Sequence, residues 1–181
     1  MKKFIIFWVA VCLAFFSSAA VFASAEEGAP RIYAADCTAT QGGYAYVDIK
    51  AENLSDVGSM EVYVSYDTSV FAYNSSSENG LNAGNICEVA DDSEEGVVKL
   101  ISLSLNGMNG SGNLWRITFS VAKDAPVGLY TLRVAVGEVT SSALEPLEGG
   151  SGNGKITLKE SSVPVQRMYI YANAGPAAHE G

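Results

Sequence analysis

The stretch that most constrains the fold of this 181-residue chain is residues 112–138, where two alternating patterns flank a turn. Apolar side chains occupy every second position from Trp115 to Val121, with polar side chains between them. This period of two, rich in aromatic and β-branched residues, is typical of a strand with one buried face. After a turn around Pro126, the same period returns from Tyr130 to Val136. Two such strands need an opposing layer to cover their apolar faces, so the pattern predicts stacked β-sheets.

The rest of the chain carries the same strand signals, separated by turns. Gly, Asn and Ser residues predict a turn at 53–56, loops at 74–84 and 106–113, and a flexible connector at 149–154. We therefore predict an all-β sandwich of nine strands, at residues 31–37, 44–51, 58–66, 70–73, 86–90, 97–105, 114–121, 129–138 and 155–159.

The two ends of the chain lack the strand pattern of this central domain. Lys2 and Lys3 precede an apolar run at 4–22 and the small residues 23–25, which predicts a secretory signal peptide at 1–25. The alternative is an uncleaved membrane anchor, because the run approaches the length that spans a bilayer. Cleavage would give a secreted or cell-surface protein with no membrane segment, a domain at 26–159 and a flexible tail at 160–181.

Composition argues against several classes of function. The net charge of −9 disfavours nucleic acid, whose phosphates require Lys and Arg. The one histidine, His179, is nearly terminal, and neither Cys37 nor Cys87 has a histidine beside it. We therefore expect a binding module and not an enzyme, with no cofactor. The acidic turn at 91–96 has two interpretations, a solvated loop tip or a weak calcium site.

Three motifs in order resemble the cohesin family. They are S-Y-D-T-S-V-F at 65–71, L-W-R-I-T-F-S-V at 114–121 and D-A-P-V-G-L-Y at 124–130, where cohesins have S-Y-D-P-x-x-L, L-x-x-I-T-F-x-V and A-P-x-G-x-Y. The similarity extends from Ile32 to Leu158. Thr68 stands where the family usually has proline, and residues 74–92 follow no family pattern.

The resemblance implies a nine-stranded jelly-roll sandwich whose partner is a dockerin, a small helical module that carries its own calcium on secreted enzymes. Cohesins assemble such enzymes for polysaccharide degradation. The chain lacks the D-x-D-x-D-G loops of a dockerin, so it would be the receptor half. In the family the first and fifth strands lie in different sheets, which disfavours a Cys37–Cys87 disulfide.

The family's docking face lies on its third, fifth, sixth and eighth strands. Projecting it onto the outward positions of this sequence predicts nine partner-binding residues: Ser59, Glu61, Tyr63, Glu88, Lys99, Ile101, Leu103, Thr131 and Arg133. The outward position of Ile101 and Leu103 depends on Lys99 pointing to water. The reverse pleat would place Val98 and Leu100 outside instead.

A second candidate function has the same fold but a different ligand. Carbohydrate-binding modules share this sandwich and stack exposed aromatic rings on sugars. Trp115 falls in the inward register of its strand. A planar strip of three exposed aromatics on one face would favour sugar, whereas the mixed acidic, aliphatic and hydroxyl face projected above favours a protein partner. The candidates are Tyr33, Tyr44, Tyr46, Tyr63, Tyr73 and Trp115. A structural adhesion module without a soluble ligand is a third possibility.

Overall fold

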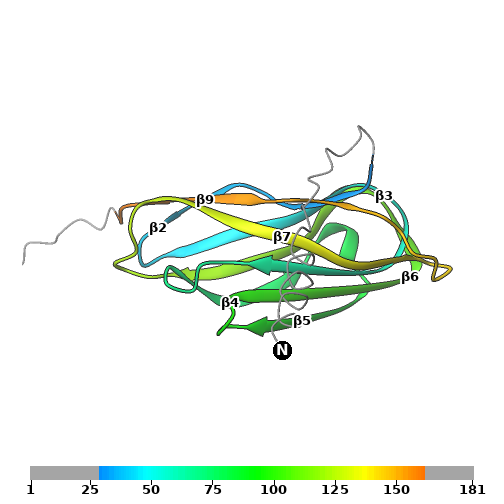
Figure 1. Ribbon diagram of the computed structural model, residues 1–181, viewed down its shortest axis with the longest axis horizontal. Helices are drawn as coiled ribbons and strands as arrows, with labels where there is room; N and C mark the ends of the chain where they lie inside the picture. The colour runs from blue at the N-terminus through cyan, green and yellow to red at the C-terminus, as the bar shows by residue number, and fades with distance from the viewer. Residues whose placement is uncertain (1–28, 162–181) are drawn as a thin grey trace, which may run out of the picture.

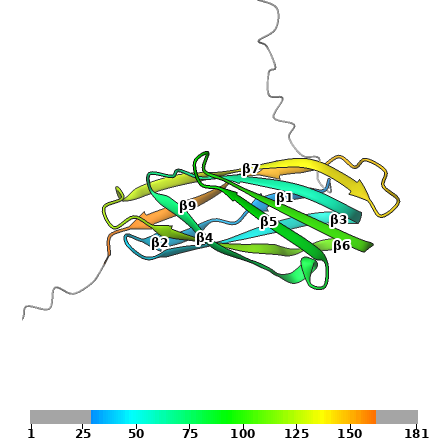
Figure 2. The same cartoon turned by 90° about the horizontal axis from the view of Figure 1, so that it is seen from below.

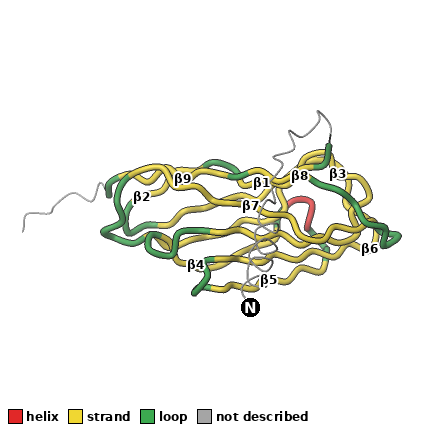
Figure 3. Tube along the Cα trace, viewed as in Figure 1, coloured by secondary structure: helices red, strands yellow, loops and turns green. Residues whose placement is uncertain are grey.

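The computed structural model describes residues 29–161. Within this range the chain is an all-β sandwich with one short 3-10 turn (Figures 1 and 3). The strands run along the long axis, and the described chain begins and ends at opposite ends of that axis (Figures 1 and 2). The predicted signal peptide and all but the first two residues of the predicted tail lie outside the described residues.

Nine strands occupy the described residues. In chain order, with the 3-10 turn η1, they are β1 (Arg31–Ala34), β2 (Cys37–Thr40), β3 (Tyr44–Ser65), β4 (Phe71–Glu78), η1 (Gly80–Asn82), β5 (Ile86–Asp92), β6 (Val97–Val121), β7 (Gly128–Ser141), β8 (Gly150–Gly152) and β9 (Gly154–Lys159).

Two long strands, β3 and β6, pair with each other and take part in both layers. The first half of β3 pairs with the second half of β6, and residues 59–65 pair with residues 97–103. β4 extends the first of these pairings and β1 flanks it on the other side, while β5 and β7 flank the second. The sandwich therefore has a β5–β6–β3–β7 sheet and a β4–β6–β3–β1 sheet, joined by strands that bend from one to the other.

The predicted turn at 53–56 and loop at 106–113 were wrong, because both segments are irregular parts of long strands. Asn53 and Asp56 have positive φ angles of 55° and 52°, and the pairing of β3 with β6 shifts register around them. Their backbone N–H groups donate to side chains of β6, Asn53 to Ser111 Oγ at 2.9 Å and Asp56 to Asn109 Oδ1 at 2.9 Å. Asn, Asp, Ser and Gly thus form bulges here instead of ending the strands.

Three other boundaries also differ from prediction. The first predicted strand is two, because β1 pairs with β3 whereas β2 pairs in parallel with β9. The predicted flexible connector contains β8, which pairs in parallel with β1. The predicted loop at 74–84 instead holds the end of β4 and η1, whose buried Asn82 donates to Leu114 O at 3.1 Å.

The core lies between the two sheets and follows the predicted alternation. Trp115 and Phe119 are fully buried. The rings of Tyr66 and Phe71 lie 4.9 and 6.2 Å from that of Phe119, measured between centroids. Cys37 and Cys87 are both free thiols.

Candidate functional site

The predicted partner face is the outer surface of the β5–β6–β3–β7 sheet, which we call the docking face. The register of its strands sets cross-strand rows. Glu88 of β5 lies opposite Ile101 of β6, which lies opposite Glu61 of β3. Ser59 lies opposite Leu103. These four strand segments, distant in sequence, thus bring most of the predicted residues together on one surface.

The pleat of β6 is the one predicted. Val98 and Leu100 are fully buried, so the residues between and beyond them point outward. Lys99 and Ile101 are half-buried, and the side chain of Leu103 is 39% exposed. The reverse pleat is therefore excluded.

Two further aliphatic residues lie on this face, and sequence analysis missed both. Ile86 is 64% exposed and pairs with Leu103, and Leu105 is 82% exposed at the next outward position of β6. The alternation along the two strands could have predicted both. Ile86 is two residues from Glu88 and Leu105 is six residues from Lys99, so each lies on the same side of its strand as a predicted outward residue. Together with Ile101 and Leu103 they form an aliphatic patch at one end of the docking face. Exposed aliphatic residues gathered this way are a mark of interaction sites.

Beside the aliphatic patch lies a polar cluster centred on Glu61. Lys99 Nζ is 2.9 Å from Glu61 Oε1, and the Tyr63 hydroxyl donates to Glu61 Oε2 at 2.8 Å. Lys99 Nζ also lies 5.5 Å from the centroid of the Tyr63 ring. The pKa of the Glu61 carboxyl lies below its usual value, mainly because of the hydrogen bond from Lys99 and secondly because of that from Tyr63. The hydrogen bond to Glu61 in turn raises the pKa of Lys99.

Gly137 of β7 leaves the space that this cluster occupies. A Cβ at this position would lie 2.9 Å from Tyr63 Cε2 and 3.2 Å from Glu61 Cβ. The cluster is therefore held by three strands, with Lys99 on β6, Glu61 and Tyr63 on β3, and Gly137 on β7.

The remaining predicted residues border this centre. The Ser59 and Thr140 hydroxyls are 2.7 Å apart across β3 and β7. Arg133 is exposed at one corner, opposite Ser65. Thr131 is exposed too, but its part of β7 pairs with β9 and not with β3. The structure thus places Thr131 outside the four-strand centre of the docking face.

The acidic turn closes the polar end of the docking face. A shallow groove of about 440 Å³ lies there, lined by Tyr63, Ala90, Asp91, Asp92, Glu95, Val97 and Lys99. Asp91 Oδ1 accepts a hydrogen bond from the Tyr66 hydroxyl, and Asp92 Oδ1 accepts one from the Glu95 N–H. In the described part of the chain, no three His, Cys, Asp or Glu side chains converge as metal ligands would.

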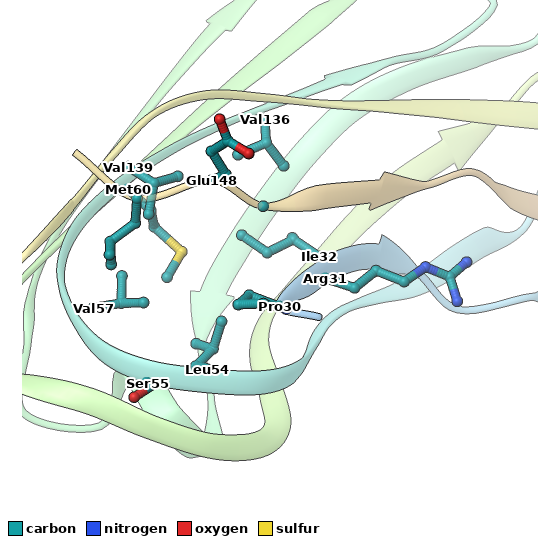
Figure 4. A pocket seen from close by; sticks show the side chains of 12 residues that line it. Pro30, Arg31, Ile32, Leu54, Ser55, Val57, Met60, Val136, Val139 and Glu148 are labelled. Atoms are coloured by element: carbon teal, nitrogen blue, oxygen red, sulfur yellow. The ribbon is translucent and has the colours of Figure 1, made fainter. Parts of the chain in front are cut away.

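A second hollow, of about 170 Å³, lies between the sheets at the end where β1 begins (Figure 4). Its walls are mainly aliphatic, with Ile32, Leu54, Val57 and Met60 among them, and the Arg31 side chain extends away from it. Arg31, Ser55 and Glu148 are the polar or charged side chains in the lining. Among residues 29–161, no helix is long and apolar enough to cross a membrane.

Comparisons with known proteins agree with this architecture. A family model described as the cohesin domain matches residues 35–158. No curated protein matches the chain.

Solved cohesin structures are similar in fold. A non-cellulosomal cohesin from the archaeon Archaeoglobus fulgidus is 21% identical, with a TM-score of 0.65 over 72% of this chain and 91% of that one. A type I cohesin–dockerin complex from Clostridium thermocellum gives 14% identity and a TM-score of 0.67 over 72% of this chain and 99% of that one. A type I cohesin of Pseudobacteroides cellulosolvens gives 20% identity and a TM-score of 0.63 over 78% and 98%.

Proposed function

This chain belongs to the cohesin family, and on that premise we propose that it is a non-catalytic receptor for the dockerin module of secreted enzymes. The observation that carries the proposal is the docking face, where Ile86, Ile101, Leu103 and Leu105 expose aliphatic surface beside the Glu61 cluster. Several structures of similar fold are cohesin–dockerin complexes.

The two parts of the docking face have different tasks in this proposal. The aliphatic patch buries against the apolar side of a dockerin helix and supplies most of the affinity. The Glu61 cluster is already ordered by Lys99 and Tyr63, so the partner's donors meet a carboxylate that is fixed in place. Polar groups at the rim contribute orientation and association rate more than affinity.

Calcium enters through the partner in this proposal. Among the described residues no cluster of metal ligands exists on this chain. A dockerin that needs calcium to fold would lose its binding surface in chelator. Chelator should therefore abolish the complex while leaving the thermal unfolding of this protein alone unchanged.

Titration calorimetry against a panel of calcium-loaded dockerins tests the proposal. Leu103→Asp should weaken binding strongly, and Glu61→Ala should weaken it less. Leu144→Asp is the matched control, since Leu144 is 77% exposed but lies in the loop after β7. The proposal fails if no dockerin binds. If dockerins bind and Leu103→Asp binds equally well, the docking face is wrongly placed.

The proposed setting is extracellular, with the enzymes acting on polysaccharide. It rests on the basic start, apolar run and small residues of the first 25 positions. The N-terminal sequence of protein recovered from culture medium should begin at Glu26. Recovery of the intact chain in the membrane fraction would show an uncleaved anchor instead.

A further inference from the structure

The outer surface of the β4–β6–β3–β1 sheet, on the other side of the sandwich, carries a pair of exposed tyrosines. Tyr44 and Tyr46 lie two residues apart on β3 and are 51% and 57% exposed. Their ring centroids are 6.4 Å apart and the rings are tilted by 40°. Of the other aromatic candidates on this sheet, Tyr33 and Tyr73 are half-buried and Trp115 is fully buried in the core.

The positions next to the tyrosines carry hydroxyls and an amide. Tyr44 lies opposite Ser120, and Tyr46 opposite Thr118, which in turn lies opposite Ser75 of β4. Asn74 Nδ2 donates to Ser120 Oγ at 3.3 Å. These side chains have small polar groups that both donate and accept hydrogen bonds. None of them is charged.

The nearest charges on this surface cancel each other. Arg116 is bidentate to Asp48, through Nε to Oδ1 at 2.7 Å and through a terminal nitrogen to Oδ2 at 3.0 Å. This hydrogen bond lowers the pKa of the Asp48 carboxyl, so both groups are ionised at neutral pH. The Arg116–Asp48 pair is thus neutral as a unit, and Lys50, the next outward residue of β3, adds one positive charge beside it.

We propose that Tyr44 and Tyr46, with Thr118, Ser120 and Asn74, form a binding site for a neutral polysaccharide chain. The C–H faces of a sugar ring are apolar and pack on an aromatic ring, while its hydroxyls exchange hydrogen bonds with side chains around that ring. A neutral ligand is not repelled by the negative net charge of the protein. We call this surface the tyrosine face.

A protein occupant fits these residues less well. The tyrosine face lacks the aliphatic patch of the docking face, and protein interfaces usually have an apolar centre that is fully buried. Because the two faces lie on different sheets, a dockerin and a polysaccharide could be held together. The proposed site does not depend on dockerin binding, so each can fail without the other.

Affinity electrophoresis in gels containing soluble neutral glucan, xylan or mannan, together with NMR titration using cellohexaose, tests the site. Wild-type protein should be retarded by at least one of the three polysaccharides, and the double variant Tyr44→Ala/Tyr46→Ala should bind about tenfold more weakly. Tyr44→Phe/Tyr46→Phe keeps both rings and should retain most of the binding. Tyr63→Ala removes a tyrosine from the docking face and should bind like wild type. Thermal unfolding of each variant verifies that it is folded.

Three results would overturn the proposal. The first is no retardation of wild type by any of the three polysaccharides and no shift with cellohexaose. The second is equal retardation of wild type and the double alanine variant. The third is a concentration-dependent dimer in sedimentation that the double alanine variant abolishes, because the tyrosine face would then bind a second copy of the chain.

Discussion

The docking face and the tyrosine face are built from opposite halves of the same two strands, β3 and β6. The halves around Glu61 and Ile101 present aliphatic side chains and an ion-paired cluster. The halves around Tyr46 and Thr118 present rings and hydroxyls, with the charges of Asp48 and Arg116 paired beside them. One continuous hydrogen-bonded pair of strands thus offers two chemically different surfaces, because each half shows only its outward residues.

The largest expected effect comes from removing what the two faces share. Phe119 is fully buried between the sheets and contacts the Tyr66 and Phe71 rings. Phe119→Ala should cost about 3–5 kcal/mol of unfolding free energy, from lost burial and the cavity left behind. Denaturant unfolding measures this cost. A loss below about 1 kcal/mol would mean that the sheets close over the gap and that the core is more adaptable than its packing indicates.

The next effect should separate the two faces. Leu103→Asp places a charge in the aliphatic patch and should weaken dockerin binding by about 1–3 kcal/mol or more. Its unfolding free energy and its retardation by polysaccharide should stay close to wild type, because Leu103 is on the outer surface. Calorimetry and affinity electrophoresis on the same sample measure both. Loss of both activities together would show that the faces are coupled.

Gly137→Ala should give a smaller and more local effect. The new Cβ would crowd the Tyr63 ring and Glu61, whose side chains must shift. Both are partly exposed, so we expect a stability cost of about 1 kcal/mol or less. Dockerin affinity should fall, because the Glu61 cluster loses its arrangement. Gly128→Ala is the matched control, since a Cβ there meets nothing. Equal affinity for wild type and Gly137→Ala would remove the cluster from the interface.

The smallest expected effect is the change in unfolding free energy when low pH protonates a carboxylate of an exposed ion pair. The pKa of Glu61 is lowered by Lys99, so the ion pair stabilises the fold above the usual Glu pKa. That contribution is lost as the pH falls through the lowered pKa in the folded state. Glu61→Gln should therefore be less stable than wild type near neutral pH and equal to it in strong acid. Asp48→Asn should follow the same course on the tyrosine face, because Arg116 lowers the pKa of Asp48.

Those two profiles are checked by unfolding at a series of pH values. The effect in each case should be well below that of Phe119→Ala, since exposed ion pairs add little stability. A difference that grows toward acid would contradict the assigned pairs.

The sequence predicted features that depend on neighbouring residues better than features that depend on distant strands. Period-two alternation around Phe119 and Val62 correctly predicted which side chains are buried, because burial of apolar residues decides the register of a strand. Strand ends were predicted less well. Asn53 and Asp56 are turn formers by local preference, yet pairing with Asn109 and Ser111 of β6 keeps them within a bulged strand. That partner is more than 50 residues away and leaves no local trace.

The candidate site shows the same division. The alternation of side chains along β6 was enough to place Lys99, Ile101 and Leu103 outward, and the same alternation would have predicted the outward position of Leu105. The Glu61 cluster needed the cross-strand register, which periodicity does not give. Thr131 was predicted as an outward residue of the eighth strand, and it is exposed, but its part of that strand pairs with β9 instead of β3.

The most direct test of the docking face is NMR mapping of backbone amide shifts in the labelled protein on saturation with a calcium-loaded dockerin. We expect the largest perturbations at residues 59–63, 86–90 and 97–105, and little change at residues 44–48 and 116–120 of the tyrosine face. The same spectra recorded with chelator should show no perturbation, because the dockerin then lacks its folded surface. Perturbations centred on residues 44–48 and 116–120 would contradict the account and assign the partner to the opposite sheet.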